Sequence, residues 1–266
     1  RRGGQTVHHD FHQRASKELG YLEEEARHYG LTLAILAGDL QQAWAVSLLS
    51  ELYQKGNVDP GLVLGLIREL EGRVTPILLE GETLDFRYAA LSVSQLSQKR
   101  ILEMLWKKTA NLYEFCGRAG ALIGLGRLEL EDPRVCSLAA FTGKCGLAFQ
   151  LQDDLLGAVG NQDKLGKPVG SDILEGKKTL IAYLAFNRAN EGEREKLERI
   201  FGNRQATAEE IQEVVRCFQE SGALDDVQSL ARTYLQEALE ALETLPPSNP
   251  KDLLTLWADY MLNREL

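Results

Sequence analysis

The sequence has little positive charge, few cysteines and few long apolar runs, and each shortage excludes a class of protein. Its 30 Lys and Arg are outnumbered by 39 Asp and Glu, which gives a net charge of -9 at pH 7. Nucleic-acid binding needs basic surface to displace counterions from phosphates, so we expect no nucleic-acid partner. No apolar run reaches the roughly 20 residues that cross a bilayer, and no signal peptide is visible. We therefore expect a cytoplasmic protein without a membrane span.

The cysteines also indicate what the protein is not. Cys116, Cys136, Cys145 and Cys217 show neither a CxxC spacing nor the pairing with histidine that is typical of zinc sites. We predict buried thiols in a reducing compartment rather than disulfides or metal ligands.

Periodic apolar residues predict helices along most of the chain, and no stretch alternates as a β-strand does. The expected helices cover residues 29–53, 62–79, 96–125, 135–159, 206–221 and 223–245, with a last one after a turn at 246–250. The helix over 29–53 is apolar enough to be buried, and Pro76 is expected to kink or end the next one. Residues 160–171 form a loop rich in glycine and lysine. The sequence thus predicts one all-α domain over residues 1–266.

The most informative segment places two adjacent carboxylates inside an apolar helix. Residues three and four apart share a helix face, so Gln150, Asp153 and Asp154 point in related directions. A charge without a partner would be costly among the surrounding Leu, Phe and Ala side chains, which favours a functional pair over a solvated one. Hard cations such as Mg2+ join one or two carboxylates to the phosphates of a substrate. We predict Asp153 as the direct ligand, and Asp154 as its support or the partner of a basic residue.

Lysines and a third carboxylate follow this helix at close range. Lys167 lies in the loop, Asp172 comes directly after it, and Lys177 and Lys178 follow. Two adjacent lysines cannot both face one site. Together, these residue types suit a divalent metal that bridges the protein to a phosphate-rich ligand.

At these residues the chain resembles the trans-isoprenyl diphosphate synthases, or polyprenyl synthetases. The second aspartate-rich motif of that family reads roughly FQxxDDxxD, and a GK pair and D-x-x-x-x-K-x-T/S come after it. The matching residues are Phe149, Gln150, Asp153, Asp154, Gly166, Lys167, Asp172, Lys177 and Thr179. Further elements that resemble the family occur in order: RRG at 1–3, AILAGD at 34–39, GETLD at 81–85, KT at 108–109, GA at 120–121 and SGA at 221–223. The resemblance covers nearly the whole chain.

Two departures from the family pattern stand out. Gly157 occupies the position of the usual third Asp of DDxxD. The first aspartate-rich motif is not in the sequence and would precede Arg1. We therefore expect the N-terminal helices to be missing and the chain to hold one side of a metal site.

The resemblance implies a fold and an activity. The fold is a single large helical bundle of the isoprenoid synthase type around a central cavity. The activity is a Mg2+-dependent prenyl transfer that condenses isopentenyl diphosphate with an allylic diphosphate (C5–C15) to a longer trans-polyprenyl diphosphate. We interpret the product as C15–C20. Three Mg2+ ions per active site are implied, some of them held by the first motif, and so is a homodimer.

The resemblance also assigns roles to individual residues. Asp153, with Asp172 through water, would hold Mg2+. The allylic diphosphate would be bound by Lys108, Lys167 and Lys177, and the allylic cation would lie beside Thr109 and Gln150. The second diphosphate would be bound by Arg1, Arg2 and His8. Further substrate contacts would come from Phe149 and Asp154. Lys177 is chosen over Lys178 by the family register. Asp39 and Asp85 are either substrate contacts or structural hydrogen-bonding groups.

Two other functions fit part of the sequence. A noncatalytic partner subunit with the same fold would explain Gly157 and the lack of the first motif, although such subunits tend to lose the lysines and the KT and FQ elements that this chain keeps. A class I terpene cyclase shares the helical fold and Mg2+ chemistry but does not need the features of a second diphosphate site.

Overall fold

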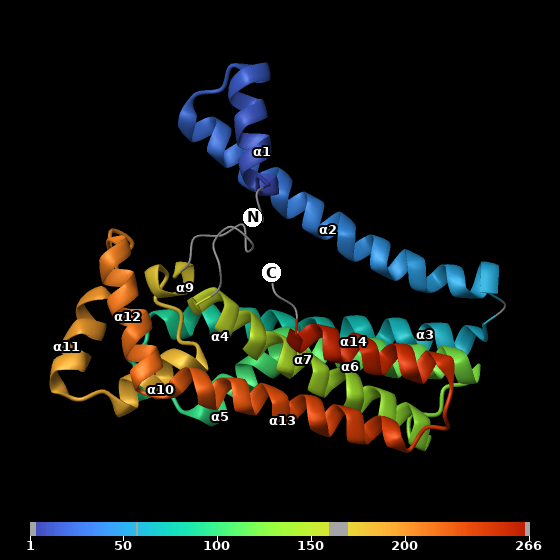
Figure 1. Cartoon of the computed structure of the whole chain (residues 1–266). Coiled ribbons are helices and arrows are strands. Elements are labelled where there is room, and N and C mark those ends of the chain that lie inside the picture. Colours follow the sequence, from blue (N-terminus) through green and yellow to red (C-terminus); the bar gives the residue numbers. More distant parts are fainter. Residues whose placement is uncertain (1–3, 57, 160–169, 264–266) are drawn as a thin grey trace. The chain divides into compact units, whose positions relative to one another are not determined.

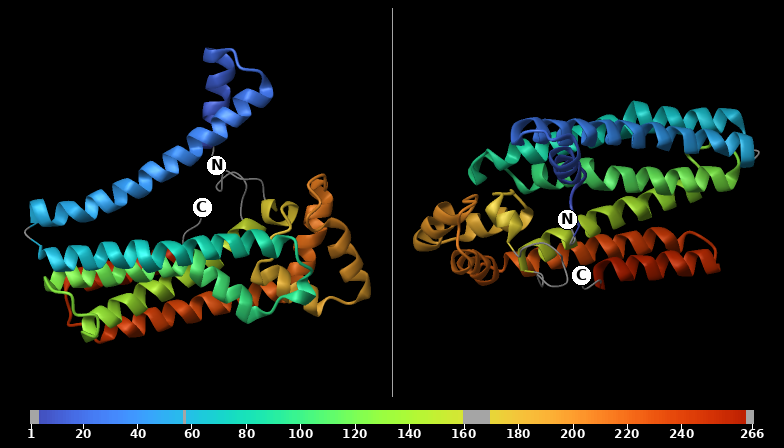
Figure 2. Two further views of the ribbon diagram at one scale, coloured as in Figure 1. Left: turned by 180° about the vertical axis from the view of Figure 1, so that it is seen from behind. Right: turned by 90° about the horizontal axis from the view of Figure 1, so that it is seen from above.

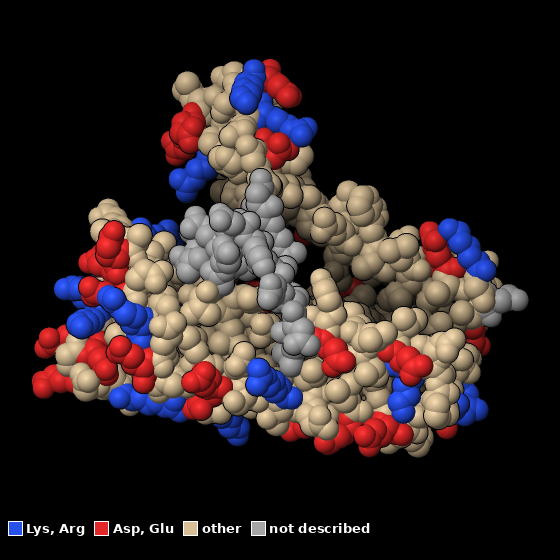
Figure 3. Space-filling model, viewed as in Figure 1, with Lys and Arg blue, Asp and Glu red and all other residues tan. Residues whose placement is uncertain are grey.

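The structure, a computed structural model, describes residues 4–56, 58–159 and 170–263 (Figure 1). Every regular element in these ranges is a helix, which confirms the predicted all-α fold. The chain divides into two compact units, Arg1–Ile67 and Arg68–Leu266. The prediction of a single domain over 1–266 stays a prediction. Lys and Arg side chains are interspersed with Asp and Glu on the face that Figure 3 shows.

The N-terminal unit is built on a long helix. Its elements are α1 (Val7–Arg14), the π-helical turn η1 (Ala15–Leu19), α2 (Glu23–Gly56) and most of α3 (Pro60–Glu69). Helix α1 packs against α2 at Gly30, where a Cβ atom would lie 2.2 Å from the carbonyl oxygen of His8. Only glycine permits the two helices to approach so closely.

The expected burial of the helix over 29–53 is not provided by the N-terminal unit itself. Helix α2 does form, but within this unit only Ala26 and Gly30 are buried along it, because α1 and η1 cover only its first turns. By length and composition it is also the one helix in the described ranges that qualifies as a membrane span. Core helices of soluble proteins share this length and composition. The absence of a membrane span stays a prediction.

The C-terminal unit is a bundle of helices centred on α7. Its elements are η2 (Leu70–Val74), α4 (Thr75–Ala89), η3 (Val93–Gln95), α5 (Gln98–Leu105), η4 (Trp106–Ala110), α6 (Asn111–Leu125), α7 (Pro133–Val159), α9 (Ser171–Leu174), α10 (Leu180–Arg188), α11 (Glu191–Ile200), α12 (Ala208–Glu220), α13 (Ala223–Glu243) and α14 (Asn249–Asn263). Helix α7 lies between α6 and α13, and Figure 2 shows the three side by side. Leu151 of α7 shares one buried cluster with Ile181 and Val227, and Phe141 shares another with Met261.

Pro76 does not end its helix. A π-helical turn, η2, ends at Val74, directly before α4, and α4 continues thirteen residues beyond Pro76 to Ala89. Proline is tolerated in the first turn of a helix, where its missing N–H has no partner to lose. The turn η2 thus lets the chain restart as α4 with Pro76 in that position.

The cysteines are free thiols, but only half of them are buried. Cys145 and Cys217 lie in the core, as predicted, whereas Cys116 and Cys136 are exposed. Burial raises the pKa of the Cys145 thiol to about 12, so this thiol stays protonated at neutral pH. The prediction of buried thiols is wrong for Cys116 and Cys136, because each lies on a helix face that the neighbouring helices leave open.

Candidate functional site

Predicted site residues from separate stretches of the sequence meet near the last turns of α7. The stretches are α4, the π-helical turn η4, α7 itself, and α9 with the residues after it. The turn η4 contacts both α4 and α7, and α9 contacts α7. The side chains that they bring together are Asp85, Lys108, Thr109, Gln150, Asp153, Asp154, Asp172 and Lys177. All of them belong to the C-terminal unit.

Lys108 and Thr109 lie on η4, which interrupts the helical path between α5 and α6. Single π-helical turns inside α-helices occur frequently at functional sites. Helix α4 lies directly against this turn, since a Cβ on Gly81 would be 2.3 Å from the backbone nitrogen of Lys108. One turn further along α4, Asp85 Oδ2 accepts a hydrogen bond from Lys108 Nζ at 2.8 Å. The ion pair therefore fixes the direction of the Lys108 side chain.

From the sequence, the role of Asp85 was undecided and a role of Gly81 was not recognised. The GETLD element at 81–85 carried both residues, so the signal was present. Its meaning depends on a contact between α4 and η4, more than twenty residues apart, which no local pattern shows.

A chain of hydrogen bonds links η4 to the carboxylates of α7. Thr109 Oγ1 donates to Gln150 Oε1 at 2.8 Å, and Gln150 Nε2 donates to Asp154 Oδ1 at 3.0 Å. This arrangement orients the Gln150 amide. Asp154 is only 8% exposed, and its other oxygen, Oδ2, has no hydrogen-bond partner among the described residues.

Burial, and after it the nearby charge of Asp172, raise the pKa of Asp154 to about 7. The Gln150 hydrogen bond and the nearby charge of Lys108 act in the opposite direction. A buried carboxylate without full pairing is costly, which is why the neutral form persists to such a high pH. A cation placed beside this group would favour its charged form.

The stability of the metal-free protein is expected to depend on this carboxyl. Its pKa is about 7 when folded, against an ordinary 3.8, so the folded protein binds more protons than the unfolded chain in that window. Stability therefore falls as the pH rises from about 4 to about 7, by at most roughly 4 kcal/mol at 1.36 kcal/mol per pKa unit. Asp154→Asn lacks the ionisable group and should show a smaller loss over the window. Urea unfolding of both proteins in EDTA at several pH values measures the difference, and identical pH profiles would contradict the buried carboxyl.

Asp172 and Lys177 form a second pair beside α7. Lys177 Nζ lies 2.9 Å from Asp172 Oδ1 and 3.6 Å from Glu175 Oε2. Burial lowers the pKa of Lys177, but the charge and hydrogen bond of Asp172 outweigh it, so the net shift is upward. Lys177 is therefore a permanent cation at neutral pH. The side chain of Asp172 is 15% exposed.

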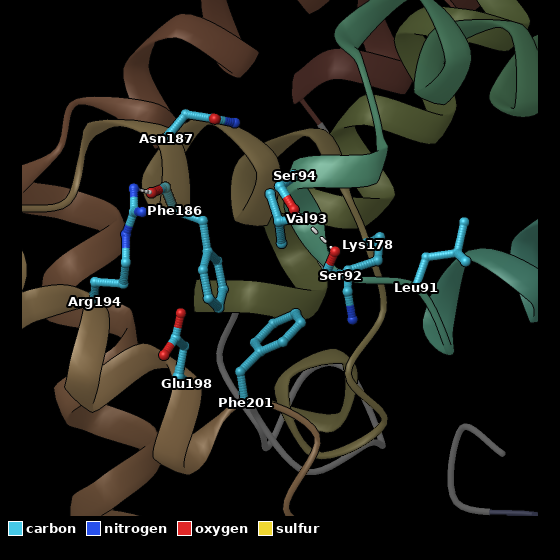
Figure 4. A pocket seen from close by; sticks show the side chains of 10 residues that line it. All are labelled: Leu91, Ser92, Val93, Ser94, Lys178, Phe186, Asn187, Arg194, Glu198 and Phe201. Carbon is cyan, nitrogen blue, oxygen red and sulfur yellow. Dashed lines mark hydrogen bonds between the residues drawn. The ribbon is translucent and has the colours of Figure 1, made fainter.

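Lys178, the neighbour of Lys177, is directed elsewhere. Its Nζ donates to the carbonyl oxygens of Gly176 at 2.8 Å and Ala89 at 3.2 Å, and it lies 5.0 Å from the centre of the Phe201 ring. Figure 4 shows it on the wall of a cavity of about 300 Å³ that Phe186 and Phe201 also line. Burial lowers the pKa of Lys178.

The remaining predicted residues lie in other parts of the described structure or outside it. Phe149 packs on Tyr113, with ring centres 5.8 Å apart, in the aromatic cluster near α14. His8 is exposed on α1 of the N-terminal unit, where it lines a hollow of about 360 Å³ with His12, Arg27 and Leu31. The predicted residues Arg1, Arg2 and Lys167 lie outside the described residues.

The carboxylates of α7 and α9 fit a Mg2+ ion that is shared with a substrate. Within the described ranges, no group of three or more His, Cys, Asp or Glu side chains is arranged to hold a metal by itself. Mg2+ does not require one, because it commonly uses one or two carboxylates and completes its shell with water and substrate phosphate. Asp153 offers hard oxygen ligands, and the buried Oδ2 of Asp154 lies next to it in sequence without a hydrogen-bond partner among the described residues. Asp172 is close enough to raise the pKa of Asp154.

Comparison with known proteins gives one consistent result. The family model described as polyprenyl synthetase matches residues 1–218. The geranylgeranyl diphosphate synthase of Methanosarcina mazei is 36% identical over 237 residues, which are 89% of this chain and 68% of that protein. A short chain isoprenyl diphosphate synthase of Methanothermobacter thermautotrophicus is 34% identical over 240 residues, or 89% of this chain and 69% of the relative.

Solved structures give the same result for the fold. The geranylgeranyl pyrophosphate synthase of Corynebacterium glutamicum, complexed with isoprenyl diphosphate and magnesium, aligns with a TM-score of 0.83 at 25% identity over 99% of this chain and 71% of that one. A polyprenyl synthase of Caulobacter crescentus, complexed with calcium and isoprenyl diphosphate, aligns with a TM-score of 0.76 at 31% identity over 91% and 69%. Both relatives thus carry a divalent cation and a diphosphate together.

Proposed function

The chain belongs to the polyprenyl synthetase family, and we propose on this basis that it lengthens an allylic diphosphate with isopentenyl diphosphate. The sequence-based predictions of this family, of its all-α isoprenoid synthase fold and of a prenyltransferase are confirmed. The observation that carries the proposal for this chain is the convergence of two lysines and three carboxylates, Lys108, Lys177, Asp153, Asp154 and Asp172, near the last turns of α7.

The lysines are proposed to bind the diphosphate of the allylic substrate. Diphosphate is a poor leaving group until its charge is neutralised, and fixed cations around it favour its departure. Asp85 orients Lys108, and Asp172 orients Lys177, so both ammonium groups have defined positions before substrate binds. Lys167 is kept as a third proposed contact.

Asp153 is proposed to hold Mg2+, with Asp172 as an indirect ligand through water. A bound Mg2+ supplies Lewis-acid stabilisation of the charge that develops on the leaving diphosphate. Three Mg2+ ions per site are proposed. Asp154, which is buried and ends the hydrogen-bond chain from Thr109, orients the Gln150 amide and adds negative charge to the site when it ionises.

The reaction breaks the allylic C–O bond, and the electron pair leaves with the diphosphate. The double bond of isopentenyl diphosphate then attacks the allylic carbon, a C–C bond forms, and a proton is lost to the released diphosphate. The oxygen dipoles of Thr109 and Gln150 are proposed to stabilise the positive charge on the allylic carbon. Water must be excluded at this stage. Arg1, Arg2 and His8 are proposed contacts of the second diphosphate, and Phe149 a further substrate contact.

We further propose a C15–C20 product, a homodimer and a cytoplasmic location. Geranylgeranyl diphosphate, the product in the name of the Methanosarcina relative, lies at the upper end of that range. Four free thiols in the structure agree with a reducing compartment.

The proposal is tested by incubating the full-length protein with Mg2+, isopentenyl diphosphate and dimethylallyl, geranyl or farnesyl diphosphate. Chromatography of the products is expected to show chains longer than the primer, up to C20, and none in EDTA. A hydrocarbon formed from the allylic diphosphate alone would identify a cyclase instead. Failure to elongate any primer would favour a noncatalytic subunit, the alternative function that would explain Gly157 in place of the usual Asp.

A further inference from the structure

Gly157 lies on the face of α7 that carries the site carboxylates, four residues after Asp153 and three after Asp154. A carboxylate from another element fills the space beside its Cα atom. A Cβ built on Gly157 would lie 2.7 Å from Asp172 Oδ2 and 3.4 Å from Asp172 Cγ. The backbones are also joined, because Gly170 N donates to the carbonyl oxygen of Gly157 at 3.3 Å.

The Asp172 carboxylate is held in this position from its other side. Lys177 Nζ contacts Oδ1 at 2.9 Å, and Lys177 N donates to the Asp172 carbonyl oxygen at 3.0 Å. Oδ1 is therefore engaged by Lys177 while Oδ2 faces α7. Figure 1 shows α9, which carries Asp172, beside the end of α7.

We propose that Gly157 is a positioning residue, whose missing side chain lets the Asp172 carboxylate reach the face of α7 that carries Asp153. The motif DDxxD usually places a carboxylate on position 157 itself. In this chain, the carboxylate at that place comes from α9. The inference rests on the proposed function, since it concerns the Mg2+–diphosphate site of the same reaction.

The geometry distinguishes this role from a purely structural one. The atom that a new Cβ would meet is the far end of a side chain, so the carboxylate can turn away while both backbones stay in place. Alanine also has a higher helix propensity than glycine. Gly157→Ala should therefore keep or raise the melting temperature and still move the Asp172 carboxylate away from the metal site.

The test is a double-mutant cycle read by calorimetric titration of inorganic diphosphate into the full-length protein at fixed Mg2+ concentrations. Gly157→Ala is expected to weaken Mg2+-dependent diphosphate binding roughly 10- to 100-fold, as for other residues that orient metal ligands. In the Asp172→Ala background, which has no carboxylate to displace, the same change should have no further effect. Gly192→Ala is the matched control, because its nearest neighbour would be 3.7 Å away, and it should alter binding by less than about twofold.

Gly157→Asp is an independent test of the positioning role, since it restores the usual DDxxD motif. The inference expects it to bind no more tightly than the wild type, because its Cβ displaces Asp172. Tighter binding by Gly157→Asp, unchanged binding by Gly157→Ala, or full additivity with Asp172→Ala would overturn the inference.

Failure of the inference and failure of the proposed function give different results. If the wild type elongates primers but the cycle is additive, the function stands and the positioning role is wrong. If the cycle shows coupling but no primer is elongated, the positioning role stands and the function is wrong. A wild type that shows no Mg2+-dependent diphosphate binding would overturn both.

Discussion

Asp153→Ala is expected to abolish prenyl transfer while leaving the fold intact. The change removes the carboxylate proposed to hold Mg2+. Without this ion, the negative charge on the leaving diphosphate would not be neutralised. Preorganised electrostatic groups of this kind contribute several kcal/mol to a transition state, so turnover should fall at least about 1000-fold. Asp153 is only partly buried and fills no core volume, so the melting temperature should change little. Steady-state kinetics and thermal unfolding of the same preparation measure both effects.

The matched control is Asp259→Ala, which removes an exposed carboxylate from α14 and leaves the α7 site untouched. It should retain wild-type turnover. Retained turnover in Asp153→Ala would show that the metal is held by other residues. A large loss of stability in that variant would instead assign Asp153 a structural role.

Lys108→Met is expected to lower kcat/KM about 100-fold, the effect of removing one fixed donor from a developing negative charge. It removes the ammonium group that Asp85 orients on η4 and leaves a side chain of similar length. Both side chains of this ion pair are largely buried, at 15% and 20% exposure, so leaving Asp85 without this partner should cost roughly 1–3 kcal/mol of stability. Titration with inorganic diphosphate should show weaker binding in parallel.

The adjacent Lys107 is the control for this variant. It lies on the same turn but contacts Glu80 at 2.6 Å and Glu103 at 2.9 Å, both about half exposed. Lys107→Met should leave turnover nearly unchanged, because the side chain is directed toward these glutamates. Equal losses in the two variants would mean that the shape of η4 matters and the Lys108 charge does not.

Local patterns in the sequence were sufficient for the carboxylate face. Gln150, Asp153 and Asp154 share a helix face because of the helical repeat, and the structure links two of them directly at 3.0 Å. Asp172 and Lys177 are five residues apart, so their pairing is also a local property. Boundaries of the amphipathic helices after residue 206 were likewise close to those observed.

Features that depend on contacts between distant elements were not predictable. The apolar pattern over 96–125 predicted one continuous helix and did not show η4. A single π-helical turn changes the spacing of apolar residues only locally, so the helical pattern continues on both sides of it. The role of Gly81 arises from the backbone of η4, and the proposed role of Gly157 arises from the side chain of Asp172 on another helix. Apolar content also predicted burial for α2, but composition does not specify what covers a helix.

The most direct test of the site is anomalous diffraction from crystals of the full-length protein grown with Mn2+ and inorganic diphosphate. We predict an Mn2+ peak at about 2.1 Å from a carboxylate oxygen of Asp153. The diphosphate oxygens should lie within about 3 Å of Lys108 Nζ and Lys177 Nζ. A metal and diphosphate bound elsewhere, with Asp153 and both lysines uninvolved, would contradict the site proposed at the end of α7.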